Sequence, residues 1–482
     1  MTRRWRAVDL LDLVLEAGSF ESWDQPIDLS GHPEEYRLEL LAARASAGTD
    51  ESVLTGMGLV RGRPVVVLVN EFGFLAGSIG RDAARRIVAA VRRATALGLP
   101  VLASTASGGT RMQEGTPAFL EMVEISRAVM DHRAAGLPYL VYLRHPTTGG
   151  VYASWGSLAH VTVAEPGALV GFLGPKVYEA LRGRPFPRGV QVADNLAAKG
   201  VIDAVVEPHA LPELVDRALA VLLDAPGVPV LPRRGGSCSD YDAWDSITRT
   251  RGPDRVGTRD LLRGGGSNTI RLRGTDEGER DDTVLVALTR LDGQPCVLVG
   301  QDRSRQSPAT PMGPGALREA RRGMRLADEL GLPLVTVVDT PGAELSPAAE
   351  NGAIAGEIAR CIATMTTMRV PTIAVLLGQG CGGGALALFP ARTVIAAEHA
   401  WLAPLPPEGA SVIVHGDTSH AAAMARAQGV RAADLADLGA VHHVVPEPEG
   451  DTAAELAAAV VAECAHRLAD RSSLTLKDVA LP

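Results

Sequence analysis

Cysteine is scarce in this chain and follows no pattern. The five residues form no CxxC pair and stand at no histidine spacing that suits zinc (Cys238, Cys296, Cys361, Cys381 and Cys464). An odd number of cysteines without a disulfide framework is typical of reduced thiols. We therefore expect a cytoplasmic protein with no bound metal.

Long apolar segments are also missing. No run approaches the roughly 20 apolar residues that a membrane-spanning helix needs. Asp9 and Asp12 interrupt the apolar stretch near the N-terminus, which is therefore no signal peptide. The formal net charge is −9, whereas nucleic-acid-binding domains usually carry a clustered basic surface. We expect neither a membrane nor a nucleic acid as a partner.

Lysine is nearly absent, and its three positions exclude one nucleotide site. Lys176, Lys199 and Lys477 do not follow a glycine, but a P-loop requires GxxxxGK(S/T). The VVDTPG segment at 337–342, which resembles a GTPase element, therefore does not indicate a GTPase.

A second nucleotide motif is equally misleading. Gly378, Gly380 and Gly383 follow a predicted strand and mimic the GxGxxG fingerprint of dinucleotide-binding folds. The helix after them would be very short before Pro390, and the matching turn in the first half lacks the pattern. Dinucleotide binding is therefore the weaker interpretation.

What the chain does contain is a long internal repeat. Shifted by 233 positions, the LGLP segment at 97–100 coincides with LGLP at 330–333, Gly149-Gly150 with Gly382-Gly383, and Ala164-Glu165 with Ala397-Glu398. This period is far longer than that of a solenoid repeat and predicts two whole domains built alike. We place these domains at 1–232 and 233–482. Two similar domains can form two similar pockets, which suits a reaction with two chemically similar participants.

Strands and helices are expected to alternate in both halves. Apolar runs predict strands at 64–69, 99–104, 138–143, 160–164, 295–299, 333–338, 371–377 and 392–397, with helices at 81–98, 117–135, 315–331 and 350–368. Continuous apolar strands that alternate with helices indicate an α/β fold with parallel sheets covered by helices. The Gly- and Pro-rich segment 225–285 is interpreted as a linker and irregular entry to the second half.

Each half also has a strand that ends in a glycine-rich turn and opens a helix. These turns are PTTGGVYAS at 146–154 and GQGCGGGALA at 378–387. Glycine lets a ligand approach the backbone, and the free N–H groups at a helix start carry partial positive charge. Such a nest can stabilise an oxyanion, where one donor is worth about 10²–10³ in rate. A merely structural tight turn is the alternative, and the duplication gives the two interpretations similar weight.

A second glycine turn follows the LGLP strand of each half. SGGTRMQEG at 107–115 and DTPGAEL at 339–345 could supply the second donor of each oxyanion hole. The candidate substrate-binding residues are Gly108, Gly109, Thr110, Arg111, Gly342 and Ala343. For Arg111, a local ion pair with Glu114 is the simpler alternative to general acid–base catalysis.

These motifs carry a family resemblance. SGGTRMQEG, HPTTGGVYAS, AEPGALVGFLGP and NEFGFLAGSIG resemble the β subunit of bacterial acetyl-CoA carboxylase carboxyltransferase over 61–206. LDGQPCVLVG, VDTPGA, RVPTIAVLLGQGCGGGALAL and PPEGASVI resemble the α subunit over about 283–446. The resemblance implies a fused β–α carboxyltransferase whose halves are tandem crotonase-like (ββα-superhelix) domains.

The resemblance further implies a reaction and a site. A carboxyl group would move from carboxybiotin, on a separate carrier protein, to the α-carbon of acetyl-CoA or a related acyl-CoA, giving malonyl-CoA or an analogue. The thioester oxygen and the biotin ureido oxygen would each become negative, which matches two oxyanion holes. By analogy Gly149 and Gly150 would serve one hole, and Gly383, Gly384 and Ala385 the other. Family members build the site between two protomers, so a homodimer or homohexamer is expected.

The chain departs from the family pattern in several places. It lacks the four-cysteine zinc ribbon of the β subunit, ELSPAAENGAIAGE replaces the usual loop after DTPGA, and Arg303 and Arg305 stand where lysines are usual. It has neither an MKM biotinylation motif nor an ATP-binding glycine loop, so the biotin carboxylase and the carrier are expected on other chains. Two alternatives stay open: a biotin-independent malonyl-thioester decarboxylase, and a non-catalytic scaffold in a carboxylase complex.

Overall fold

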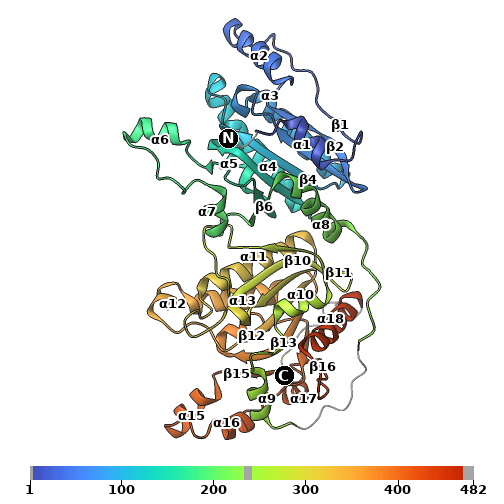
Figure 1. Ribbon diagram of the computed structural model, residues 1–482, viewed down its shortest axis with the longest axis vertical. Helices are drawn as coiled ribbons and strands as arrows, with labels where there is room; N and C mark the ends of the chain where they lie inside the picture. The colour runs from blue at the N-terminus through green and yellow to red at the C-terminus, as the bar shows by residue number, and fades with distance from the viewer. Residues whose placement is uncertain (1–3, 233–240, 471–482) are drawn as a thin grey trace. The chain divides into compact units, whose positions relative to one another are not determined.

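A computed structural model describes residues 4–232 and 241–470, which form two compact units. The N-terminal unit comprises residues up to Leu219 together with Asp276–Gly278, and the C-terminal unit comprises Ala220–Thr275 and the chain from Glu279. In Figure 1 the first runs from blue to green and the second from green to red. The domain boundary that we propose from the repeat, between 232 and 233, falls at the edge of a segment outside the described residues.

The N-terminal unit is built on an eight-stranded sheet with the order β1-β2-β3-β4-β5-β6-β8, and β7 pairs with β5. The strands are β1 Glu21–Ser22, β2 Val53–Val60, β3 Arg63–Asn70, β4 Val101–Ser107, β5 Tyr139–Thr148, β6 Val161–Ala164, β7 Val170–Gly171 and β8 Ala204–Val205. The helices are α1 Ala7–Val14, α2 Glu34–Ala47, α3 Arg81–Leu97, α4 Gly115–Ala134, α5 Gly149–Tyr152, α6 Pro175–Arg182, α7 Ala193–Ala198 and α8 Leu211–Leu223. From β3 onward every pairing is parallel, whereas β1, β2 and β3 pair antiparallel.

The C-terminal unit repeats this plan with the order β16-β14-β13-β12-β11-β10-β9, and β15 pairs with β13. The strands are β9 Gly266–Leu272, β10 Val284–Leu291, β11 Gln294–Gln301, β12 Leu334–Thr340, β13 Thr372–Cys381, β14 Thr393–Ala397, β15 Trp401–Ala403 and β16 His443–Val445. The helices are α9 Ala243–Thr250, α10 Thr258–Gly265, α11 Pro314–Leu330, α12 Pro347–Asn351, α13 Ile354–Thr367, α14 Gly382–Leu386, α15 Pro407–His415, α16 Ala421–Ala427, α17 Ala432–Asp437 and α18 Ala453–Ala469.

The internal repeat is visible in the positions of the elements. Both ends of α3, β4 and β5 are displaced by 233 residues from the ends of α11, β12 and β13. The pair β2–β3 is displaced by 231 residues from β10–β11, because the loop before α11 is two residues longer than the loop before α3. The last residues of β3 and β11, Asn70 and Gln301, therefore occupy equivalent places.

The first long helix of the repeat shows how the sequence produces the layers. In α3, Ala83, Ile87, Val91 and Ala94 recur at helical spacing and are fully buried, so one face packs into the core of the unit. The helix ends at Gly98, whose φ of 67° is the left-handed conformation that a glycine C-cap provides.

The predicted alternation of strands and helices is confirmed, and one prediction about irregular structure is wrong. The segment 225–285, interpreted from its glycines and prolines as a linker, contains α9, α10 and strand β9. It supplies the edge strand of the second sheet, since β9 pairs antiparallel with β10. Glycine and proline content alone did not reveal that the chain between 241 and 272 is ordered by packing.

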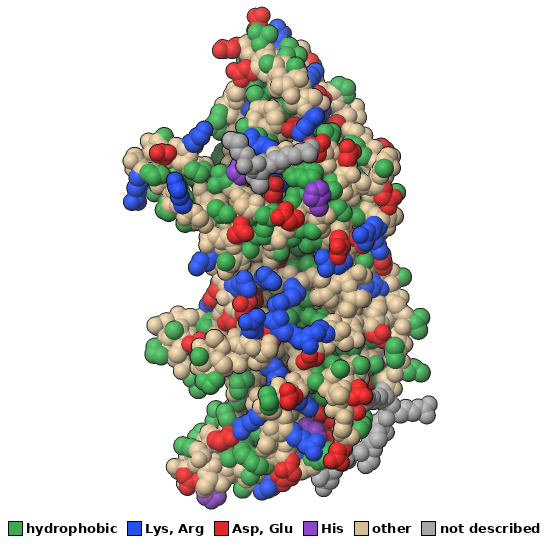
Figure 2. Space-filling model, viewed as in Figure 1, with side chains coloured by type: hydrophobic (Ala, Val, Ile, Leu, Met, Phe, Trp, Pro, Cys, Tyr) green, Lys and Arg blue, Asp and Glu red, His purple; other side chains and the backbone are tan. Residues whose placement is uncertain are grey.

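Arginine forms a local concentration of charge in the C-terminal unit despite the negative net charge. Figure 2 shows Lys and Arg side chains gathered over the region of α11 and β10. On α11, Arg318 pairs with Glu279 at 2.9 Å and Arg321 pairs with Glu357 at 3.0 Å. These positive charges are therefore partly compensated within the unit.

No helix within residues 4–232 or 241–470 is long and apolar enough to cross a membrane.

A buried carboxyl in the C-terminal unit makes stability depend on pH. Glu319 on α11 is 4% exposed and accepts the backbone N–H of Gly274, and burial raises the pKa of its carboxyl to about 8 from the ordinary 4.5. The folded chain holds this proton where the unfolded chain releases it, so stability falls as pH rises from about 4.5 to about 8.

We therefore predict that Glu319→Gln, which keeps the acceptor for Gly274, matches the wild type near pH 4.5 and is more stable above pH 8. The expected gain is on the order of a few kcal/mol. Urea unfolding across this pH range measures it, with exposed Glu350→Gln as the control. A stability difference that does not change with pH contradicts the prediction.

Candidate functional site

The two glycine turns predicted in the N-terminal unit lie against each other. Strands β4 and β5 are parallel neighbours, with Ser107 opposite Thr147, so the turns that follow them meet at one edge of the sheet. Gly109 and Gly149 have φ values of 108° and 62°. A Cβ added to Gly109 would lie 3.3 Å from the Cα of Gly149, and one added to Gly149 would lie 3.2 Å from the Cα of Gly109. Both positions therefore require glycine.

Most N–H groups of these turns are already used by the fold. Gly108 donates to the carbonyl of Ala76 at 2.9 Å, Gly109 to the hydroxyl of Ser107 at 3.0 Å, and Gly149 to the carbonyl of Phe172 at 2.9 Å. These three predicted residues shape the turns, because their amides have no further proton to donate.

Among the six predicted site residues of the N-terminal unit, two amides remain as donors. Among the described residues we find no acceptor for the N–H of Thr110 or Gly150, and both residues are partly exposed. A Cβ on Gly150 would lie 2.9 Å from Oγ1 of Thr110 and 3.3 Å from Cγ of Met122, so the space beside these amides is open only because residue 150 is glycine. The pair Thr110 and Gly150 thus forms the candidate oxyanion site of this unit.

The C-terminal unit repeats the arrangement. Gly342 and Gly382, with φ values of 135° and 62°, follow the parallel neighbours β12 and β13. The N–H of Gly342 donates to Oγ1 of Thr340 at 3.1 Å, as Gly109 does to Ser107. Within the described chain we find no acceptor for the N–H of Ala343 or Gly383, and both are partly exposed.

The remaining predicted residues of this unit lie behind these amides. Gly384 and Ala385 are buried in the first turn of α14, and the carbonyl of Gly384 accepts from Gln301 at 2.8 Å. A Cβ on Gly384 would lie 2.7 Å from Cε of Met312 and 3.0 Å from the N of Ala343. Of the three residues predicted for the second hole, Gly383 is thus the one that reaches the surface.

Arg111 lies buried in a network of hydrogen bonds within the N-terminal unit. It is 1% exposed, and its guanidinium forms two hydrogen bonds with Glu51, one of them 2.9 Å long, and one with the carbonyl of Ser78 at 2.8 Å. The expected pair with Glu114 is confirmed at 3.5 Å. Burial alone would lower the pKa of Arg111, but the bonds and charge of Glu51 raise it above its ordinary value. Sequence reasoning missed Glu51, which is 60 residues away and matches no motif.

A buried carboxyl lies near the glycine turns of the C-terminal unit. Asp339 is fully buried near the end of β12; Nη1 of Arg303 lies 3.4 Å from its Oδ2, and the N–H of Gln379 donates to its Oδ1 at 3.1 Å. Burial raises the pKa of Asp339 to about 6, although these partners lower it. A carboxyl with this raised pKa can change charge near neutral pH.

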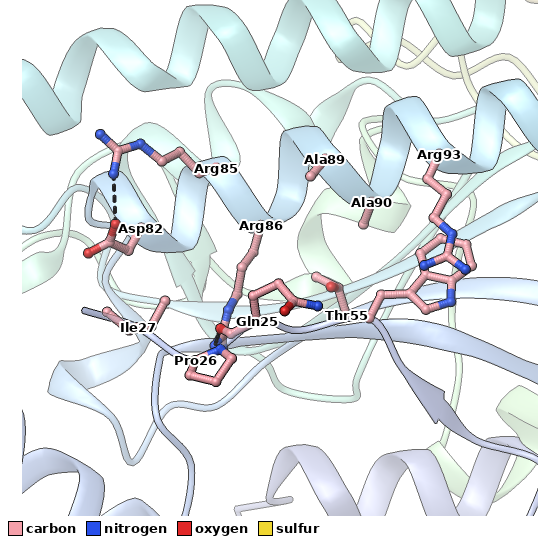
Figure 3. A pocket seen from close by; sticks show the side chains of 11 residues that line it. Gln25, Pro26, Ile27, Thr55, Asp82, Arg85, Arg86, Ala89, Ala90 and Arg93 are labelled. Carbon is pink, nitrogen blue, oxygen red and sulfur yellow. Dashed lines mark hydrogen bonds and ion pairs between the residues drawn. The ribbon is translucent and has the colours of Figure 1, made fainter.

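A cavity of about 360 Å³ lies elsewhere in the N-terminal unit (Figure 3). It is bordered by α3 and the segment 23–27, and none of the predicted site residues lines it. Its charged side chains are engaged, since Arg85 pairs with Asp82 at 2.9 Å and Arg86 with Asp50 at 2.6 Å. The cavity therefore adds no donor to the candidate site.

Cys296, Cys361, Cys381 and Cys464 are free and buried, and Cys238 lies outside the described residues. Burial raises the pKa of Cys381, next to the second glycine turn, to about 11. Across the described ranges no group of three or more His, Cys, Asp or Glu side chains is arranged to hold a metal ion.

Solved structures share this fold. A transcarboxylase 12S structure, described as a hexamer with methylmalonyl-CoA and methylmalonic acid bound, matches with a TM-score of 0.77 over 99% of this chain and 92% of its own, at 20% identity. A single-chain, multi-domain long-chain acyl-CoA carboxylase matches with a TM-score of 0.74 over 96% of this chain and 46% of its own, at 19% identity. The two-domain carboxyltransferase fold expected from the sequence is confirmed.

Sequence comparison identifies the family. The family model of the carboxyl transferase domain matches residues 4–471. The probable biotin-dependent acyl-coenzyme A carboxylase beta3 subunit of Mycobacterium tuberculosis is 58% identical, covering 90% of this chain and 88% of the relative. The acetyl-coenzyme A carboxylase carboxyl transferase subunits beta/alpha of Salinispora arenicola are 39% identical, covering 86% and 76%. The chain therefore belongs to the carboxyltransferases of the biotin-dependent acyl-CoA carboxylases.

Proposed function

We propose that this chain transfers a carboxyl group to the α-carbon of acetyl-CoA or a related acyl-CoA, giving malonyl-CoA or an analogue. Carboxybiotin on a separate carrier protein would supply the carboxyl group. The observation that carries the proposal is a duplicated pair of partly exposed residues whose amides have no acceptor among the described residues: Thr110 with Gly150, and Ala343 with Gly383. The names of the two relatives support the same reaction class.

The geometry suits a reaction in which two oxygens become negative. The thioester oxygen gains charge when the α-proton leaves, and two preorganised N–H donors lower the energy of that charge. The second pair of amides can receive the oxygen of the carboxyl donor as its carboxyl group departs. Each donor is worth about 10²–10³ in rate when it is aimed at the developing charge.

The fixed backbone explains why such donors are effective. Neither pair requires a side chain to reorganise, because the amides belong to turns held by glycines at positive φ and by the hydroxyls of Ser107 and Thr340. Preorganised dipoles of this kind stabilise a transition state without further ordering at the moment of reaction.

The proposal includes the partners that the reaction needs. We expect a biotinylated carrier and a biotin carboxylase on other chains, and a homodimer or homohexamer of this chain in the cytoplasm. The hexamer described for the transcarboxylase 12S neighbour is consistent with such an assembly.

The reverse half-reaction tests the proposed function directly. The purified protein is incubated with malonyl-CoA or methylmalonyl-CoA, with and without free biotin, and release of CO₂ is measured. Biotin-dependent release is expected, and the preferred substrate identifies the acyl group. Release without biotin would indicate a thioester decarboxylase, and no release with either substrate would favour a non-catalytic scaffold; both results contradict the proposal.

A glycine substitution tests the oxyanion assignment. Gly150→Val places a Cβ 2.9 Å from Oγ1 of Thr110 and fills space beside the candidate donors. We expect turnover to fall by at least about 10²-fold, the value of one lost donor. The control is Gly174→Ala in the same unit, because Gly174 has open space around its Cβ position and a φ of −59°. Wild-type turnover by Gly150→Val would remove these amides from the mechanism.

The burial of Arg111 leads to a different expectation for its side chain. Arg111→Met leaves Glu51 as a buried charge without its partner, so the free energy of unfolding should fall by about 3–5 kcal/mol. Arg127→Met removes an exposed pair with Glu124 and should cost no more than about 1 kcal/mol. Chemical denaturation compares the two variants. A stable Arg111→Met protein with a raised KM for the acyl-CoA would instead indicate direct substrate contact.

A further inference from the structure

One side chain connects the two glycine turns of the C-terminal unit. Gln301, the last residue of β11, is fully buried. Its Oε1 accepts the backbone N–H of Asp339 at 2.9 Å, and its Nε2 donates to the carbonyl of Gly384 at 2.8 Å. The first partner lies at the end of β12 and the second in the first turn of α14, after β13. The side-chain amide of Gln301 therefore connects β11 with β12 and with α14, which lie next to the candidate donors.

These partners are adjacent to the donors themselves. Gly384 directly follows Gly383, and Asp339 begins the turn that leads to Ala343. A second glutamine holds the same turn: Nε2 of Gln306 donates to the carbonyl of Asp339 at 3.1 Å, and its Oε1 accepts from the hydroxyl of Thr340 at 2.7 Å. Of the two glutamines, Gln301 is the one that contacts both turns.

The N-terminal unit places a shorter amide at the equivalent position. Asn70, the last residue of β3, is also fully buried, but its Nδ2 donates to the carbonyls of Ser52 at 3.2 Å and Gly77 at 3.4 Å. It bonds with neither Gly150 nor the turn that holds Thr110. The amide in β11 is one methylene longer, and its two bonds go to the turns of the candidate site.

We propose that Gln301 is a positioning residue that sets the distance between the two oxyanion donors Ala343 and Gly383. The inference rests on the proposed function, because it assigns those amides to the reaction. A misplacement of about 1 Å in a catalytic site can cost about 10²-fold in rate. Loss of the two hydrogen bonds of Gln301 should therefore lower kcat strongly. KM for the CoA substrate should stay nearly unchanged, because the Gln301 side chain is fully buried and does not contact substrate.

The decisive variant is Gln301→Glu, which preserves the size of the side chain. Its carboxylate can accept from the N–H of Asp339 but has no proton for the carbonyl of Gly384, whereas its protonated form can donate to that carbonyl. Burial raises the pKa of such a carboxyl, so in the biotin-dependent decarboxylation of malonyl-CoA we expect kcat to fall by about 10²-fold at the alkaline end of the pH profile, where the carboxyl is ionised. The ratio of variant to wild-type kcat should recover as the pH is lowered.

Other charged groups lie near Gln301 and take part in the pH profile. The carboxyl of Asp339 and the guanidinium of Arg303 lie beside the turn. A carboxylate at 301 would raise the pKa of Asp339, so the pH profile of Gln301→Glu reports the two carboxyls as a coupled pair, whereas Gln301→Met removes the two bonds without adding a charge. Gln301→Met, which makes neither bond, should be slow at every pH.

The same strand offers a matched control. Gln294, the first residue of β11, is 2% exposed, and its Nε2 donates to the carbonyl of Gly227 at 2.6 Å. Gln294→Glu and Gln294→Met remove a comparable buried bond far from the glycine turns. Thermal unfolding should show similar losses of stability for the two positions, whereas kcat should fall only for the Gln301 variants.

The possible results separate the positioning role of Gln301 from the proposed oxyanion site itself. Both Gln301→Glu and Gln301→Met should lose kcat. Recovery of kcat at low pH in Gln301→Glu, without recovery in Gln301→Met, supports the positioning role. Gln301 variants with the kcat of their Gln294 counterparts at every pH overturn it, provided that Gly383→Val is inactive. A fully active Gly383→Val protein overturns the proposed oxyanion site itself. Should Gln301→Glu fail to fold, kcat and KM of Gln301→Met against Gln294→Met decide in the same way.

Discussion

Close contact between two backbone turns is the constraint on which each candidate site depends. Neighbouring parallel strands lie about 4.8 Å apart, so turns that leave their ends side by side have no space for side chains between them. Gly109 and Gly149 meet at this point and both adopt positive φ; a Cβ on either residue would come within 3.2 or 3.3 Å of the Cα of the other. The N–H groups of Gly109 and Gly149 already donate hydrogen bonds within the fold. The next residues, Thr110 and Gly150, are partly exposed and their amides have no acceptor among the described residues, so these N–H groups can donate to a ligand oxygen.

The two units hold their glycine turns in place with different kinds of side-chain interaction. In the N-terminal unit the turn is braced by the charged network of Arg111 with Glu51, in which both partners are almost completely buried. In the C-terminal unit the corresponding support comes from the neutral amide of Gln301. A buried ion pair is costly to desolvate and strongly destabilising when broken, whereas a neutral amide with both ends bonded carries no such charge. The two units therefore share the backbone arrangement of the turns but differ in the side chains that support it.

The sequence predicted the layered fold and the position of the turns because both depend on local signals. Apolar runs, LGLP segments and glycine pairs recur at a fixed interval, and the structure reproduces that interval at both ends of α3 and α11. The strands β2 and β10 were missed, although each pairs antiparallel with the strand that directly follows it. Strand β9 was missed because glycine and proline content does not show that packing orders a segment. Glu51 and Gln301 were missed because neither belongs to a motif and their roles follow from contacts across 60 and 83 residues. The position of Gln301 at the end of a repeated strand, equivalent to that of Asn70, was the one signal available.

The hydrogen bonds of Gln301 and Gln306 to the backbone of Asp339 also show how a site can keep its shape while a nearby group changes charge. Gln301 bonds to the backbone N–H of Asp339, and Gln306 bonds to its backbone carbonyl, so neither contact involves the carboxyl that titrates near pH 6. That carboxyl instead accepts from the N–H of Gln379 and faces Arg303. Protonation weakens these two charge-assisted contacts but leaves both glutamine bonds intact. The position of Ala343 is therefore held by neutral groups, and the ionisation of Asp339 acts on the electrostatic field at the turn more than on its geometry.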